Sequence, residues 1–102
     1  MTKADIVDVI AQGTGLTKLE TQAVIDGFLA TVSYALKKGE RVELRGFGNF
    51  RTVKRKARIA RNPVTKEPVE VPERLAAVFR PSKELNKYIN KELKEDLEFE
   101  QE

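Results

Sequence analysis

The side chains between residues 51 and 61 include a run of bases with no acidic residue among them: Arg51, Lys54, Arg55, Lys56, Arg58 and Arg61. Guanidinium and ammonium groups bind phosphate oxygens, whereas charges on an ordinary solvated face are usually interleaved with the opposite sign. Asn62-Pro63 then interrupts the run, and an extended pattern resumes after it. This segment predicts a basic, two-legged arm that contacts nucleic acid.

The charge of the chain is divided into blocks. Residues 1–50 are neutral, residues 51–90 carry a net charge of +7 and residues 91–102 carry −4, although the whole chain carries only +3. A strongly positive middle segment is the electrostatic footprint that a polyanion requires. A merely soluble surface is the alternative interpretation of the charge alone.

Length and composition limit the class of protein. A chain of 102 residues suits one domain. An arm of about 25 residues leaves a body too small to bury a large core alone, so we expect a partner subunit. Cysteine is absent, so no disulfide framework is expected and the compartment is predicted to be reducing. Without a long apolar run, and with first residues that suit a helix rather than a signal peptide, we expect a cytoplasmic protein without membrane contact.

Two helices with capping signatures are predicted before the arm. Thr2 with Asp5, and Thr17 with Glu20, have the spacing of a capping box. The first helix is expected to end at a pair of glycines, and the second to run for about five turns to Gly39. The second helix has apolar residues at three- and four-residue spacings, which predict a core shared in large part between subunits: Val24, Ile25, Phe28, Leu29, Val32 and Leu36.

After Gly39 the apolar period changes from 3.6 to 2, with Val42 and Leu44 on one side, which predicts a strand. The following residues 46–50, GFGNF, combine glycines with aromatic side chains that must be buried. This segment either holds phosphate through its backbone N–H groups or is simply a tight connection between strands. The sequence leaves both interpretations open.

A ribbon arm is predicted over about residues 51–77. Neither side of an extended strand over residues 51–61 is apolar enough to cover a core. Ten residues at roughly 3.3 Å each span about 33 Å, whereas a compact 100-residue domain has a radius of gyration near 13 Å, so this leg must project. Pro68 and Pro72 on the returning leg are compatible with the outer edge of a two-stranded ribbon and not with a central strand.

A third helix is predicted after the arm, with Ser82 as its cap and Leu85, Tyr88 and Ile89 on its inner face. From residue 92 onward the chain is acidic and lacks a strong apolar stripe, so we expect it to fray or to be solvated. The chain is therefore divided into one domain, residues 1–93, and an acidic tail, residues 94–102.

Pro63 has the properties of a wedge that enters between base pairs. Its ring is rigid and apolar, its φ is fixed, and it has no N–H that would need a partner. An apolar side chain inserted from the minor groove unstacks a base step and bends the duplex. Arg61 and Asn62 could reach acceptors at the groove edge beside it. Taken alone, however, Asn-Pro is usually part of an ordinary hairpin turn.

Three motifs together resemble the HU and integration host factor family of bacterial DNA-bending proteins. They are GFGNF at residues 46–50, Arg61-Asn62-Pro63 followed by Thr65, and FRPSKEL at residues 79–85. The resemblance extends from residue 1 to about residue 93, and the third motif is closer to the integration host factor branch. It implies an α+β fold, in which a helical body with a short antiparallel sheet carries a long two-stranded β-ribbon arm, as an intertwined dimer.

The resemblance also implies roles for particular residues. Pro63 would intercalate, and Arg58, Arg61 and Asn62 would contact the minor groove. Phosphates would be held by Lys3, Arg45, Gly46, Gly48, Lys54, Arg55, Lys56, Arg80, Lys83 and Lys87. The implied partners are double-stranded DNA and a second copy of this chain or a related chain, in the bacterial nucleoid, and no cofactor, metal or small-molecule substrate is implied. Ala60 and Lys66 stand where the family usually has glycine, and both stiffen or alter the hairpin tip.

The leading functional hypothesis is a non-enzymatic architectural protein that binds and bends double-stranded DNA. A basic ribbon could instead bind RNA without bending DNA, but most of the few aromatic residues fall on core stripes and leave no platform for stacking unpaired bases. An enzyme is disfavoured because the chain has no histidine and no cysteine, and its carboxylates have no paired or metal-binding spacing.

Overall fold

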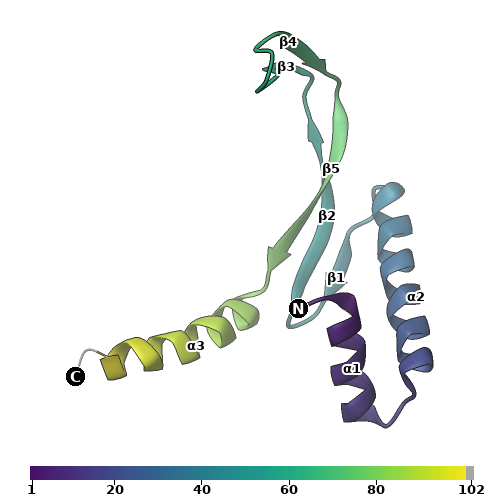
Figure 1. Ribbon diagram of the computed structural model, residues 1–102, viewed down its shortest axis with the longest axis vertical. Coiled ribbons are helices and arrows are strands. Elements are labelled where there is room, and N and C mark those ends of the chain that lie inside the picture. Colours follow the sequence, from purple (N-terminus) through teal and green to yellow (C-terminus); the bar gives the residue numbers. More distant parts are fainter. Residues whose placement is uncertain (101–102) are drawn as a thin grey trace.

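The computed structural model describes the backbone of residues 1–100 and the side chains of residues 1–91. The elements follow the chain in this order: α1 (Lys3–Thr14), α2 (Lys18–Lys37), β1 (Val42–Leu44), β2 (Gly48–Arg55), β3 (Arg58–Arg61), β4 (Pro68–Val71), β5 (Arg74–Pro81) and α3 (Lys83–Glu100). Figure 1 shows α1 and α2 side by side, the strands rising from the body as a long arm, and α3 leading away on the other side. The predicted α+β fold with a ribbon arm is confirmed.

Both capping boxes are present. In α1, the Asp5 N–H donates to Thr2 Oγ1 (3.3 Å) and the Thr2 N–H donates to Asp5 Oδ2 (2.8 Å). In α2, the Glu20 N–H donates to Thr17 Oγ1 (3.0 Å) and the Thr17 N–H donates to Glu20 Oε1 (3.2 Å). Hydrogen bonds from the Thr17 side chain and backbone hold the pKa of the Glu20 carboxyl below its usual value. Gly15 ends α1 with a left-handed φ of 78°.

The strands form one antiparallel hairpin that carries an extra strand at its base. The three-stranded sheet has the order β1-β2-β5, and β3-β4 is a separate two-stranded ladder. Gly48 to Arg55 pair with Pro81 to Arg74, and Arg58 to Arg61 pair with Val71 to Pro68. Two residues on each leg separate the ladders, so the pairing register is the same on both sides of the gap. The strand expected to run unbroken over residues 51–61 is therefore interrupted at residues 56 and 57.

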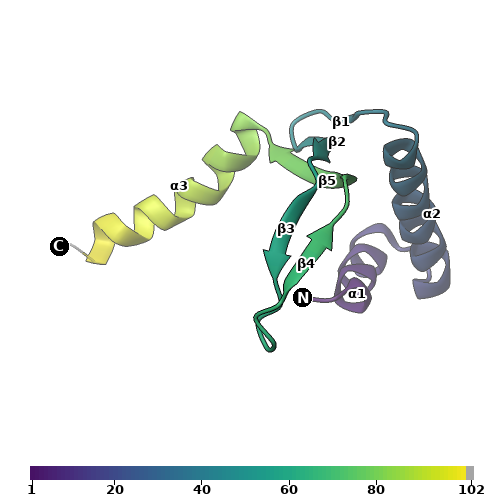
Figure 2. The same ribbon diagram turned by 90° about the horizontal axis from the view of Figure 1, so that it is seen from above.

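The arm projects as the sequence predicted. The Cα radius of gyration is 19.6 Å and the principal extents are 50 × 46 × 29 Å, whereas a compact domain of this length would have a radius near 13 Å. Figures 1 and 2 show that the distal ladder β3-β4 leans out of the line of β2-β5. The strand prolines Pro68 and Pro81 lie on β4 and β5, which are outer strands.

Helix α3 begins where the sequence predicted, because Ser82 Oγ accepts a hydrogen bond from the Leu85 N–H (3.0 Å). The helix continues to Glu100, and the expectation that the acidic end from residue 92 frays or is solvated stays a prediction. Residues 101 and 102 of the expected acidic tail lie outside the described residues. The division of the chain at residue 93 stays a prediction.

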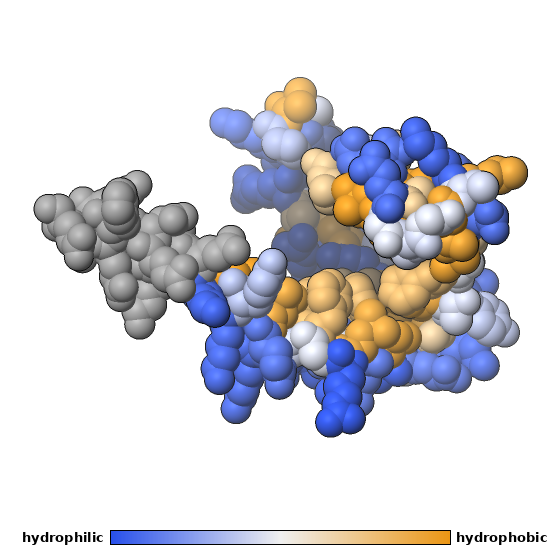
Figure 3. All heavy atoms as spheres, turned by 90° about the horizontal axis from the view of Figure 1, so that it is seen from below, coloured by the Kyte–Doolittle hydropathy of each residue, from blue (hydrophilic) through white to orange (hydrophobic). Residues whose placement is uncertain are grey.

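The body cannot bury its apolar side chains alone. Among the side chains that the structure describes, Val7 and Ala11 are the only buried apolar ones. Phe28 and Leu29 of α2 are exposed in the single chain, as are Tyr88 and Ile89, so the predicted core stripe of α2 and inner face of α3 are not covered within their own chain. Figure 3 shows apolar side chains gathered on the face between the start of α3 and the α1-α2 pair. A second chain must cover this surface, as the predicted dimer requires.

No helix in the described part of the chain has the length and apolar character that crossing a bilayer requires.

We expect the thermal midpoint of unfolding to fall when the protein is diluted, because the shared core exists only in the dimer. The midpoint should be measured by circular dichroism over a hundredfold range of concentration. A midpoint that is independent of concentration, together with a monomeric mass in solution, would contradict the shared core.

Candidate nucleic-acid interface

The base of the sheet has an apolar face and a polar face. Residues directly opposite each other on antiparallel strands point to the same side. Val42 pairs with Phe50, and Phe50 pairs with Phe79. The rings of Phe50 and Phe79 have centroids 4.9 Å apart, and α2 contacts β1 and β2. We infer that this row faces the helices and the core.

The adjacent row belongs to the opposite side of the sheet, which we call the outer face. We define the outer face by four cross-strand pairs of β2 and β5: Asn49 with Arg80, Arg51 with Val78, Val53 with Ala76, and Arg55 with Arg74. A shallow groove of about 480 Å³ runs over this part of the ribbon. Its lining includes Arg51, Arg55 and Arg80, and also Lys54 and Phe79 of the neighbouring row. The structure thus brings the predicted sites Arg55 and Arg80 together and adds Arg51 and Arg74.

The arginines of the outer face form no ion pair within residues 1–91, whose side chains the structure describes. Among the described side chains, no carboxylate oxygen forms an ion pair with Arg51, Arg55, Arg74 or Arg80. By contrast, Lys54 Nζ lies 2.7 Å from Glu73 Oε1. Of the predicted arm bases, Lys54 is therefore already paired within the chain, whereas Arg55 lies directly opposite another arginine.

The turn at Gly46 is a tight connection between β1 and β2. Gly46 has a φ of 82°, and the Phe47 N–H donates to the Leu44 carbonyl (2.9 Å). A Cβ at Gly48 would lie 2.5 Å from the Arg80 carbonyl oxygen and 2.7 Å from the Phe79 ring, so only glycine fits there. The connecting role of this segment is confirmed, and its contact with phosphate through Gly46 and Gly48 stays a prediction.

The turn also joins the start of α3 to the sheet. The Ser82 N–H donates to the Phe47 carbonyl (2.9 Å), and a hollow of about 370 Å³ is lined by residues of the turn together with Ser82. Arg45 is part of this lining, and Lys83 follows Ser82 as the first residue of α3. The predicted phosphate sites Arg45, Gly46, Gly48 and Lys83 are thus brought close together at the base of the arm. Lys87 lies one helical turn further along α3.

Lys3 is engaged elsewhere in the single chain. Its Nζ lies 2.7 Å from Asp26 Oδ1, which ties the start of α1 to α2. Both side chains are about half exposed. An exposed ion pair contributes on the order of 0–1 kcal/mol, so Lys3 could exchange the carboxylate for a phosphate at little cost.

The tip of the arm is an ordered four-residue loop over residues 63–66. Asn62 Oδ1 accepts hydrogen bonds from the Val64 N–H (2.8 Å) and the Thr65 N–H (3.3 Å). The Asn62 N–H donates to the Glu67 carbonyl (3.0 Å), and the Lys66 N–H donates to the Asn62 carbonyl (2.7 Å). The Asn62 amide oxygen is thus used within the loop, which leaves the side-chain NH₂ free to donate outward.

The loop presents apolar side chains to solvent. Pro63 is exposed at the end of the arm, and Val64, which the sequence analysis did not single out, is 88% exposed. Lys66 is the only described non-glycine residue with a positive φ, 63°. The chain therefore holds the Pro63-Val64 edge outward with a backbone conformation that costs free energy at Lys66.

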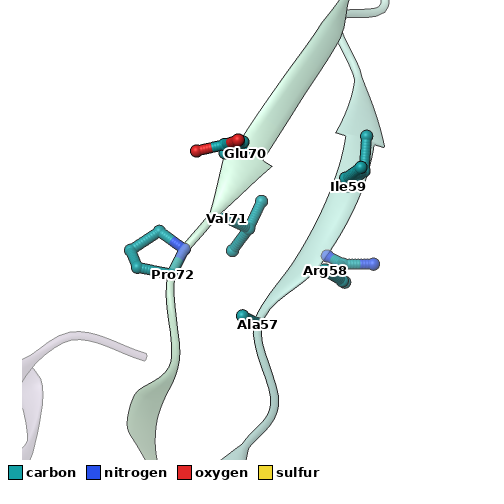
Figure 4. A pocket seen from close by; sticks show the side chains of 6 residues that line it. All are labelled: Ala57, Arg58, Ile59, Glu70, Val71 and Pro72. Atoms are coloured by element: carbon teal, nitrogen blue, oxygen red, sulfur yellow. The ribbon is translucent and has the colours of Figure 1, made fainter.

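Between the two ladders, the arm has an open hollow of about 580 Å³ lined by Ala57, Arg58, Ile59, Glu70, Val71 and Pro72. Figure 4 shows Val71 pointing from β4 toward β3, and Ala57 and Pro72 beside the break in the pairing. Lys56 and Arg58, on either side of Ala57, are exposed. The hollow marks a bend in the arm, beyond which the predicted groove residues Arg58 and Arg61 lie on the distal ladder.

Sequence reasoning did not assign Arg51 or Arg74 to the site. Arg51 belongs to the basic run, but only the strand register shows that it shares a face with Arg55 and Arg80. Arg74 is separated from the run by 12 residues and two acidic side chains lie close before it. The signal that could have found it is a hairpin register centred between Val64 and Thr65, which sets Arg55 opposite Arg74.

Comparisons with known proteins agree with this geometry. Residues 1–90 match the profile of the family described as "Bacterial DNA-binding protein". The chain is 45% identical to DNA-binding protein HU of Thermus thermophilus over 89% of this chain and 94% of that protein. It is 35% identical to the integration host factor subunit alpha of Anaeromyxobacter sp. strain K over 94% of this chain and 85% of that protein.

Among solved structures, the chain is similar to HU of Anabaena in a cocrystal with DNA, with a TM-score of 0.81 and 36% identity over 87% of this chain and 97% of that chain. It is also similar to the V42I mutant of HU from Thermotoga maritima, with a TM-score of 0.66 and 28% identity over 87% of this chain and 99% of that chain. Because relatives of both branches match, the expected closeness to integration host factor stays a prediction.

We expect Lys66→Gly to slow amide hydrogen exchange in the tip loop, because glycine adopts a positive φ without the steric cost that lysine has. The exchange rates of the Val64 and Thr65 amides should be compared with those of Lys66→Ala, which loses the charge and keeps the steric cost. Faster or unchanged exchange in Lys66→Gly would show that Lys66 does not strain the loop.

Proposed function

This chain belongs to the bacterial DNA-binding protein family that includes HU and integration host factor, and from that premise we propose that it bends double-stranded DNA by inserting Pro63 from the minor groove. Its role is architectural rather than enzymatic. The observation that carries the proposal is the projecting basic arm, which holds Pro63 exposed at its tip in a hydrogen-bonded loop.

The tip supplies the wedge. The ring of Pro63 is rigid and apolar and has no N–H, so it can lie between base pairs without leaving a donor unsatisfied. Arg61 and Arg58 of the distal ladder and the free NH₂ of Asn62 supply donors for the acceptors at the floor of the minor groove. Unstacking one step costs a few kcal/mol, and the additional contacts that the bend permits offset this cost.

The body and the proximal arm supply the anchorage. Cationic side chains and glycine backbone N–H groups flanking the bend bind phosphates and release counterions from the duplex. Those residues are Lys3, Arg45, Gly46, Gly48, Lys54, Arg55, Lys56, Arg80, Lys83 and Lys87. Two chains, identical or related, place two arms on one duplex, and we place the protein in the bacterial nucleoid.

RNA binding through the same basic ribbon is the alternative function. The exposed apolar tip favours the duplex, because an unpaired strand has no stack for a wedge to open. The ratio of affinities for nicked duplex DNA and for single-stranded RNA of equal length separates the two functions. Tighter binding to the RNA would contradict the proposal.

We expect Pro63→Ala to reduce the bend of a bound duplex more than it reduces affinity, because alanine keeps the arm contacts and lacks the ring that opens the base step. Energy transfer between dyes on the two ends of the duplex measures the bend. Pro68→Ala is the matched control, since Pro68 lies on the same arm, paired with Arg61, outside the tip loop. An unchanged bend in Pro63→Ala would rule out the wedge.

We expect Arg55→Ala and Arg80→Ala to weaken binding to all duplex sequences and to make the logarithmic dependence of affinity on salt less steep. Each lost phosphate contact should reduce the slope by about 0.9, counted once for each arm. Arg41→Ala is the matched control, because Arg41 Nη2 lies 3.1 Å from Glu43 Oε1 within the body. A slope that remains at the wild-type value would mean that neither arginine contacts a phosphate.

A further inference from the structure

We propose that Val64 is a specificity-determining residue of the arm. When Pro63 opens a base step, the Val64 side chain lies against the floor of the minor groove beside that step and selects against the amino group of guanine. This inference rests on the proposed function and deepens it, because it assigns a base preference to one side chain of the tip loop.

Val64 is placed for contact with a partner outside its own chain. Its side chain is 88% exposed, and among the large apolar side chains that the structure describes only Met1 is more exposed. The apolar faces of the helices, which a second chain must cover, lie at the other end of the molecule from the tip of the arm, as Figure 1 shows. The shared core of the dimer therefore does not account for Val64.

The loop holds Val64 in a defined position. The Val64 N–H donates to Asn62 Oδ1 (2.8 Å), and the Thr65 N–H donates to the same oxygen (3.3 Å). The Lys66 N–H closes the loop on the Asn62 carbonyl (2.7 Å). Valine is branched at Cβ and has restricted χ1 rotation, so a contact made by Val64 costs little side-chain entropy. Pro63 and Val64 thus form one stiff apolar edge.

The side chains around this edge supply donors to a groove floor and few acceptors. The Arg61 guanidinium has no acceptor, and the Asn62 amide oxygen is engaged by two N–H groups of the loop. Thr65 Oγ1 accepts from the Glu67 N–H (3.4 Å). The floor of the minor groove carries only acceptors at A·T pairs, whereas guanine adds an N2 amino donor. The tip therefore matches an A·T floor and leaves the guanine amino group without a side-chain partner.

Val64 is the residue that makes this mismatch costly. Its side chain has no acceptor, and it excludes water from the part of the floor that it covers. An N–H donor buried there without a partner costs free energy. Adenine has a C–H group at the same position, against which the valine methyl groups pack without that cost. Glu67 is the nearest carboxylate along the chain, and repulsion by the phosphates keeps it from the floor.

The experiment compares two nicked duplexes that differ only in the amino group. A nick sets the position of the opened step, because the interrupted strand resists unstacking least. The base pairs on both sides of the nick are G·C in one duplex and inosine·C in the other, and inosine lacks the N2 amino group. Fluorescence anisotropy measures the two affinities. The wild-type protein should bind the inosine duplex at least about fivefold more tightly.

Val64→Thr is the test variant, because threonine keeps the branched shape and brings a hydroxyl that can accept from the guanine amino group. The ratio of the two affinities should fall toward one in this variant. Val69→Thr is the matched control, since Val69 lies on the same arm, opposite Ala60 on the distal ladder and outside the tip loop. It should keep the wild-type ratio.

Equal affinities of the wild-type protein for the two duplexes would overturn the inference. An unchanged ratio in Val64→Thr would also overturn it, because the preference would then come from the greater flexibility of inosine pairs. An equal fall of the ratio in Val69→Thr would show that the effect does not belong to Val64. Energy transfer between the duplex ends is measured in parallel, and a wild-type protein that bends neither duplex would contradict the proposed function itself.

Discussion

Antiparallel pairing between β2 and β5 is the constraint on which the rest of the molecule depends. The pairing of Gly48 with Pro81 places Phe50 beside Phe79 on the core side and Arg55 beside Arg74 on the outer side. Because side chains alternate along a strand, a shift of one residue would exchange the two sides and expose the aromatic rings. The same register therefore determines both where the sheet packs and where its positive charge is presented.

The projecting arm and the dimer have the same cause, which is that a single chain can bury few apolar side chains. A hairpin that is rich in basic residues and has no apolar side cannot fold back onto a core, so it extends into solvent, as Figure 1 shows. The body that remains buries few apolar side chains of its own and leaves Phe28 and Ile89 exposed in the single chain. Association of two chains supplies the missing core and brings two arms into one molecule.

Local features could be predicted from the sequence, and long-range ones could not. Thr17 with Glu20 specifies a helix start within four residues, and the structure reproduces it. The alternation of Val42 and Leu44 likewise predicted β1. Arg74 and Arg55 share one side of the ribbon because of the length of the loop after Asn62. Residue types alone did not determine that length. The break at Lys56-Ala57 was also missed, because it has no distinct apolar pattern.

The central claim is that the tip of the arm enters the minor groove of a duplex. The chain contains no cysteine, so Val64→Cys offers a unique attachment point for an iron chelate that generates hydroxyl radicals at the tip. In a complex with duplex DNA, the account predicts two clusters of backbone cleavage, one on each side of the bend. The cuts on opposite strands should be offset toward the 3′ ends, as sources in the minor groove produce. Cuts offset toward the 5′ ends would place the tip in the major groove and contradict the account.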